Sequence, residues 1–140
     1  MKYTIANASK YKINKNRICL HGESSGGYLV LAVGMHLAKK GESNLIKYIL
    51  ADVPACSAEW FRKKKEDLRE AEQPVYEGHQ DSLKLMCKDS EKQCDPANLD
   101  PDIFPAEMSD ELMAKLAPCY ITTREFDQYR LDAEYISKRL

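Results

Sequence analysis

The sequence predicts an α/β protein built on a parallel sheet. Two short apolar runs that contain β-branched residues, 17–20 and 46–53, flank a longer segment, 28–38, in which apolar residues recur at helical spacing. A strand, a helix and a second strand in this order form a right-handed crossover unit, which makes the two strands parallel. With 140 residues the chain is long enough for one domain that buries roughly 68% of its unfolded surface.

Each of these elements is bounded by its own signals. Polar residues 14–16 precede the first strand. The helix carries a wide apolar face and ends at two lysines followed by Gly41, which is a helix stop signal. Pro54 closes the second strand, because proline cannot donate to a strand ladder. We therefore expect short, well-defined strands on either side of one buried helix.

The turn between the first strand and the helix has the pattern G-x-S-x-G, formed by Gly22, Ser24 and Gly26. A strand that turns sharply into a helix packs its backbone closely, so we expect side chains at positions 22 and 26 to collide there. Ser24, at the apex, should be strained and exposed. This is the setting of a nucleophile elbow, and it makes Ser24 the candidate catalytic serine.

At this point the residues resemble a known family, the α/β-hydrolase fold, and within it the hormone-sensitive-lipase-like branch (α/β hydrolase fold-3) of esterases and lipases. The stretch 17–27, Arg-Ile-x-x-x-Gly-Glu-Ser-Ser-Gly-Gly, resembles the elbow of that branch. Residues 5–16 resemble the helix and polar turn before it, and 118–127 resemble the acid-bearing strand. The resemblance implies a partial α/β-hydrolase fold: a parallel half-sheet made of the elbow strand and the two following strands, with flanking helices and a cap insertion at 57–117.

The resemblance carries the family's acid onto Asp127. The family pattern E-x-D with an arginine three residues later is matched by Glu125, Asp127 and Arg130. In the family an acidic pair usually follows that arginine. Here only its second member is present, as Asp132, because Leu131 stands where the first aspartate is expected. Two alternatives remain open: Asp127 as a surface carboxylate paired with Arg130, and Glu125 as the acid.

The same resemblance implies the other parts of the elbow. Ser24 is the nucleophile, and the backbone N–H of Ser25 is one oxyanion donor, as the residue after the nucleophile is in this fold. The elbow glycines are Gly22, Gly26 and Gly27. The family's His-Gly-Gly-Gly oxyanion loop lies well upstream of the elbow, whereas only 23 residues precede Ser24 here. We expect that loop in sequence outside these residues.

The third member of the triad, the general-base histidine, is not found at the position where the family has it. The family histidine lies a few tens of residues after the acid, and this sequence has none after His79. His36 is twelve residues along the helix from Ser24, about 18 Å away. His21 lies on the strand, where its side chain should point into a sheet face. His79 is the one histidine that distance does not exclude, and otherwise the base lies outside the chain.

The insertion 57–117 has a different pattern from the sheet elements. Trp60, Leu68 and Ala71 suggest an amphipathic helix, and four prolines punctuate the remainder. A cap over the serine would supply apolar walls for an acyl group, while a simple surface excursion explains the composition equally well. A short helix is expected after Ser109, because two acidic residues begin its first turn.

Composition excludes several other classes of protein. The net charge is −1, so no global field favours nucleic acid or an anionic membrane, and the basic run 62–65 is followed at once by acids, as on a solvated helix face. No stretch has the roughly 18 apolar residues of a membrane span, and the N-terminus lacks the apolar core of a secretory signal. The five cysteines are odd in number and widely spaced, which favours reduced thiols. These patterns predict a cytoplasmic protein with no metal and no cofactor, in which Cys19 and Cys119 are core residues.

The function that the resemblance implies is two-step acyl transfer on a small-molecule ester. Without a base and the upstream oxyanion loop, we expect the 140-residue chain alone to be a poor catalyst. Two alternatives remain: a non-catalytic remnant of the fold that binds a partner, and a serine peptidase or amidase on the same fold. The first strand should also leave an open edge through which copies of the chain associate.

Overall fold

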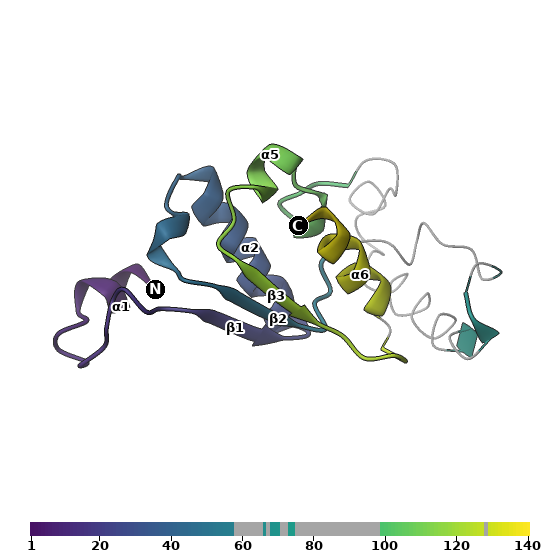
Figure 1. The fold of residues 1–140 in the computed structure, drawn as a ribbon, viewed down its shortest axis with the longest axis horizontal. Coiled ribbons are helices and arrows are strands. Elements are labelled where there is room, and N and C mark those ends of the chain that lie inside the picture. Colours follow the sequence, from purple (N-terminus) through teal and green to yellow (C-terminus); the bar gives the residue numbers. More distant parts are fainter. Residues whose placement is uncertain (58–65, 67, 71–72, 75–98, 128) are drawn as a thin grey trace, which may run out of the picture.

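The computed structural model describes residues 1–57, 66, 68–70, 73–74, 99–127 and 129–140. Figure 1 shows the arrangement of the described helices and strands. In chain order they are α1 (Lys2–Ala6), β1 (Leu20–Glu23), α2 (Ser25–Lys39), η1 (Ser43–Leu45), β2 (Ile49–Asp52), η4 (Pro105–Glu107), α5 (Asp110–Met113), β3 (Cys119–Thr122) and α6 (Arg130–Arg139).

The sheet confirms the predicted parallel half-sheet. Its three described strands lie in the order β1-β2-β3, and both pairs are parallel. Ile49 of β2 is in register with Leu20 on one side and with Cys119 on the other. All three carboxyl ends therefore meet at one edge of the sheet (Figure 1). β1 is an outer strand of the described sheet, and association of copies through it stays a prediction.

The first strand starts later than predicted. It is preceded by the short helix α1, Lys2–Ala6, and by a turn in which Lys12 adopts a positive φ of 55° and the Ile13 N–H donates to the Ala8 carbonyl at 2.9 Å. The first strand begins at Leu20 instead of residue 17, although the Ile18 carbonyl already accepts a bond of 2.7 Å from Lys47. The chain reaches the sheet through a compact turn, so the ladder starts late.

The helix α2 ends as the sequence predicts. Gly41 has a φ of 67°, its N–H binds the Ala38 carbonyl at 3.0 Å, and the Glu42 N–H binds the Leu37 carbonyl at 2.8 Å. These two bonds form a Schellman motif, in which glycine supplies the left-handed residue. The motif turns the chain sharply back toward β2.

The apolar core lies between one face of the sheet and two helices. Leu31 and Met35 of α2 and Ile136 of α6 are buried in one cluster with Ile49 and Ala51 of β2. Since side chains alternate along a strand, His21 and Tyr120 lie on the opposite face, where both are exposed. The same alternation corrects the expectation for Cys19, which precedes β1 and is exposed, whereas Cys119 is half-buried.

The helix α6 is an element that we did not expect from the sequence. It is tied to the start of the insertion by Asp132, whose buried carboxylate accepts a 2.8 Å bond from the Ser57 N–H. Its last turn carries Arg139, which donates to the carbonyls of Ala106 and Met108. This helix closes the core beside β3.

Most of the insertion 57–117, including Trp60, lies outside the described residues. Within the described part, the short helix expected after Ser109 is present as α5, and the Ser109 hydroxyl caps it by accepting a 3.3 Å bond from the Leu112 N–H. Leu68 packs against Leu131 of α6. No helix in the described part of the chain is long and apolar enough to cross a membrane.

Candidate active site

Ser24 is the single residue between β1 and α2, at the carboxyl edge of the sheet. Its φ of 56° and ψ of −117° are rarely adopted by residues other than glycine, and its side chain is exposed. Two backbone bonds hold this conformation: the Ser24 N–H donates to the Asp52 carbonyl at 2.9 Å, and the Ser24 carbonyl accepts from Tyr28 at 3.0 Å. The sharp turn expected of an elbow is therefore present, with the serine at its apex.

The glycines around Ser24 do not all have the expected role. A Cβ atom at position 22 would lie 2.2 Å from the Gly26 carbonyl oxygen, so this position requires glycine. The expected collision at position 26 is wrong, since a Cβ there meets nothing within 4 Å. The close approach is instead at Gly27, where a Cβ would lie 2.9 Å from the Asp52 carbonyl oxygen. The elbow is packed against β2 by the third glycine of the motif.

Ser25 is the first residue of α2. The first N–H groups of an α-helix have no acceptor inside the helix, and the helix dipole makes this end favourable for negative charge. The Ser25 N–H therefore lies at the end of α2 that favours negative charge, and its role as an oxyanion donor stays a prediction.

Asp127 lies in the loop that follows β3, on the same edge of the sheet as Ser24. One of its carboxylate oxygens accepts a 2.7 Å bond from the Tyr129 N–H, just before α6. Arg130, the expected partner of the alternative surface pair, binds Glu134 on its own helix. Glu125, the alternative acid, is exposed and lies 3.2 Å from the Arg69 guanidinium.

A charged network that sequence reasoning missed joins the ends of β2 and β3. The Asp52 carboxylate binds the Arg124 guanidinium through both oxygens, at 2.6 and 2.9 Å, and also accepts a bond from the Thr122 hydroxyl. The hydrogen bond from Arg124, and to a smaller extent that from Thr122, lowers the pKa of Asp52 to about 2. Partial burial acts in the opposite direction and raises the pKa, but it is the weaker effect. The carboxylate is thus charged throughout the neutral range.

A sequence signal for this network does exist. Asp52 and Thr122 are in register at the last positions of β2 and β3, next to the ends of the predicted strands, and sites gather at such ends in open α/β sheets. Val53 had no such signal: it adopts a φ of 43°, which is unusual for a β-branched residue, and it turns the chain toward Pro54 beside the elbow.

The histidines are placed as follows. His21 is exposed on the sheet face opposite the core, and its charge contributes to the low pKa of Asp52. His36 is exposed in the last turn of α2, at the far end of the helix from Ser24. His79 lies outside the described residues, as do Cys87 and Cys94. The described residues include no His, Cys, Asp and Glu group arranged to hold a metal ion.

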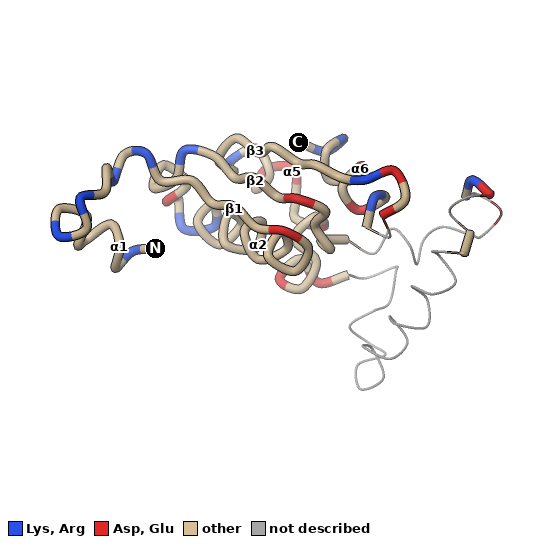
Figure 2. Tube along the Cα trace, turned by 90° about the horizontal axis from the view of Figure 1, so that it is seen from below, with Lys and Arg blue, Asp and Glu red and all other residues tan. Residues whose placement is uncertain are grey.

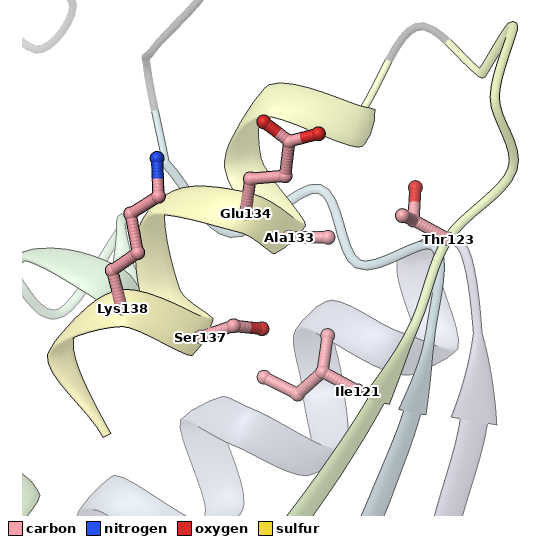
Figure 3. Close-up of a pocket in the computed structure, with 6 residues that line it drawn as sticks. All are labelled: Ile121, Thr123, Ala133, Glu134, Ser137 and Lys138. Atoms are coloured by element: carbon pink, nitrogen blue, oxygen red, sulfur yellow. The ribbon is translucent and has the colours of Figure 1, made fainter.

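A pocket of about 250 Å³ lies between β3 and α6 (Figure 3). It is lined by Ile121, Thr123, Ala133, Glu134, Ser137 and Lys138. The pocket lies beside β3, an outer strand of the described sheet, and neither Ser24 nor Asp127 is among its lining residues.

Several solved esterases have a similar fold. Brefeldin A esterase, described as a bacterial homologue of human hormone-sensitive lipase, matches with a TM-score of 0.74 and 19% identity over 99% of this chain and 39% of its own. Carboxyl esterase 2 of Tuber melanosporum matches with a TM-score of 0.72 and 22% identity, over 99% of this chain and 44% of its own. A fungal esterase from Rhizomucor miehei matches with a TM-score of 0.70 and 19% identity, over 99% of this chain and 43% of its own.

The chain therefore spans about 40% of the length of the solved structures that it matches. No curated protein sequence matches it significantly. A family model described as the alpha/beta hydrolase fold matches residues 1–140, the whole of the chain. The strand order, the strained serine between β1 and α2 and this match agree, and the chain belongs to the alpha/beta hydrolase fold-3 family.

Proposed function

We propose that the chain is the elbow-bearing and acid-bearing part of a serine esterase that works through an acyl-enzyme. The observation that carries the proposal is the backbone of Ser24. A serine held at φ 56° in a turn where Gly22 admits no side chain is strained, and strain of this kind costs about 1–3 kcal/mol. A packing turn has no need of an exposed hydroxyl in that conformation, whereas a nucleophile does.

The proposed mechanism has two steps. The Ser24 hydroxyl attacks the ester carbonyl as its proton passes to a histidine, and the alcohol leaves with that proton. A water then attacks the acyl-enzyme and releases the acid. Asp127 orients the histidine, and the Ser25 N–H stabilises the oxyanion with donors from a loop outside these residues. The base is either His79 or a histidine outside the chain.

The contacts of Asp52 support the pairing of Ser24 with Asp127. The Asp52 carbonyl accepts the Ser24 N–H, while the Asp52 carboxylate holds Arg124, three residues before Asp127. One residue thus connects the elbow to the loop that carries the acid. A connection of this kind favours a fixed distance between nucleophile and acid, which a triad requires.

The described part of the insertion supports a cap. Arg69 binds both the carboxylate and the backbone carbonyl of Glu125, and Leu68 packs against Leu131. The insertion therefore touches the acid loop and the first turn of α6. We propose that the insertion 57–117 includes a cap that provides apolar walls for the acyl group. Its last part, η4 and α5, packs instead in the core with α2.

The test uses the protein produced from the complete reading frame that encodes this chain. We expect a fluorophosphonate probe to label it at Ser24, and Ser24→Ala to abolish labelling. Ser25→Ala is the matched control, because it keeps the backbone N–H and should still be labelled. Asp127→Asn should lower kcat/KM for an aryl butyrate by about 10⁴-fold, as loss of the acid does in other triads, while Glu125→Gln should change it little.

Labelling that persists in Ser24→Ala would overturn the assignment of the nucleophile. A large loss in Glu125→Gln with a small one in Asp127→Asn would move the acid to Glu125. Turnover of a peptide or anilide in preference to the matching ester would favour the peptidase or amidase alternative.

A further inference from the structure

The amino end of the sheet carries a concentration of positive charge. Residues 1–17 contain no aspartate or glutamate, and their basic residues are Lys2, Lys10, Lys12, Lys15 and Arg17. Lys2 pairs with Glu42, whereas the other four are exposed. Figure 2 shows the basic residues along α1 and the turn that follows it, while acidic residues mark the opposite ends of β1 and β2. We call residues 9–17 the basic turn.

Exposed aromatic and aliphatic side chains are interleaved with these charges. The exposed fractions are 65% for Tyr3, 47% for Tyr11 and 40% for Ile13. The Lys10 ammonium lies 5.6 Å from the centre of the Tyr11 ring. Lysines alternate with amphipathic and apolar side chains from residue 10 to residue 13, so the patch is not a purely solvated charge run.

The basic turn has a defined conformation. Ala8 at its base is buried, and the turn is closed by backbone bonds from Tyr11 to Asn7, from Lys12 to Ser9 and from Ile13 to Ala8, at 2.9 to 3.2 Å. Its tip projects from the sheet beside α1 (Figure 1). A preformed, projecting turn reaches a flat partner without a cost of ordering the chain.

We propose that the basic turn docks this protein on an anionic lipid surface. Lysines attract the negative surface of such a bilayer, and tyrosine and isoleucine enter the zone between headgroups and acyl chains. A nucleic acid partner is less well matched, because bases stack on aromatic rings inside a positively charged groove, whereas this turn projects from the sheet (Figure 1) and carries the exposed aliphatic residue Ile13.

Docking through this turn sets the orientation of the molecule. The turn precedes the amino end of β1, whereas Ser24 follows the carboxyl end. The candidate site would therefore face the solvent when the turn is on the membrane. The docking does not depend on the proposed esterase function, and either can fail without the other.

The experiment uses the protein produced from the complete reading frame that encodes this chain and measures its binding to vesicles by co-sedimentation. We expect binding to phosphatidylcholine vesicles that contain one-third phosphatidylserine, and little to phosphatidylcholine alone. Each lysine near the surface contributes about fivefold in affinity, so Lys10→Gln/Lys12→Gln should weaken binding by about 25-fold. The matched control, Lys115→Gln/Lys138→Gln, removes the same charge from exposed positions elsewhere and should bind like the wild type.

A second variant separates the apolar contribution to vesicle binding from the electrostatic one. Ile13→Ser should weaken binding by about tenfold at both low and high salt, because it removes inserted apolar area and not charge. Circular dichroism checks that every variant is folded. Equal loss in the two double variants, no preference for phosphatidylserine, or binding to single-stranded RNA without binding to vesicles would each overturn the proposal.

Discussion

At the scale of single residues, the elbow depends on which glycine faces which backbone atom. Gly22 faces the Gly26 carbonyl, and Gly27 faces the Asp52 carbonyl, while Gly26 has open space around its own Cβ position. The motif G-x-S-x-G treats its two glycines alike, but the structure makes the first one indispensable and the second one replaceable. The turn therefore tolerates a side chain at position 26 but not at position 22.

Gly22→Ala should lower the free energy of unfolding by at least about 2 kcal/mol, because a Cβ at 2.2 Å from a carbonyl oxygen forces the backbone to move. Gly26→Ala is the matched control. It lies in the first turn of α2 with open space, so it should be neutral or stabilise by up to about 1 kcal/mol. Urea unfolding of both variants measures the difference, and equal destabilisation would contradict it.

At the scale of elements, Asp52 connects three of them. Its carbonyl belongs to the β1–β2 ladder and its carboxylate binds Thr122 at the end of β3 and Arg124 beyond it. The side chain of Asp52 is 18% exposed and that of Arg124 is 56% exposed, so the pair lies at the rim of the sheet. The pair joins the carboxyl ends of β2 and β3, where the candidate site lies.

The stability contributed by this pair should depend on pH. The pKa of Asp52 falls from 3.8 to about 2 on folding, mainly through Arg124, so the pair stabilises the fold fully above pH 4 and loses this effect as pH falls toward 2. The difference in Tm between wild type and Arg124→Met should therefore be largest near neutral pH and shrink between pH 4 and 2.

The matched control for this prediction is Arg69→Met, which removes an arginine whose pair with Glu125 is exposed on both sides, at 53% and 63%. Its Tm difference near neutral pH should be smaller than that of Arg124→Met. A difference for Arg124→Met that stays constant down to pH 2 would show that the arginine acts through packing and not through Asp52.

At the scale of the whole molecule, the described sheet brings a candidate nucleophile and a candidate acid to one edge. The two described histidines sit elsewhere, His21 on a sheet face and His36 at the far end of α2. A serine without a base is a weak nucleophile at neutral pH. The chain by itself should be a poor esterase for this reason.

The 140-residue chain should hydrolyse an aryl acetate at nearly the same low rate as Ser24→Ala and His79→Ala. Initial rates of the three proteins, each checked for folding, make the comparison. A wild-type rate more than about 10²-fold above both variants would show that His79 acts as the base. A high rate lost only in Ser24→Ala would instead point to a base from another chain.

The sequence by itself determined the fold class and the order of its main parts. Strand, helix and strand followed from the apolar runs and from Gly41 and Pro54, because these signals are local. The family resemblance then placed Ser24 and Asp127 at one edge of the sheet, although their roles stay predictions. The helix α6 was not expected, since its burial depends on partners such as Ser57 and Ala106 that are distant in the sequence.

Only the tertiary structure decided how the edge of the sheet is held together. Arg124 looks like an ordinary surface charge in the sequence, and its carboxylate partner is Asp52, 72 residues earlier. Gly26 and Gly27 are likewise indistinguishable by type, and only the approach of β2 separates them. Local propensity and periodicity are read along the chain, whereas these contacts depend on which strand ends meet when the parallel sheet forms.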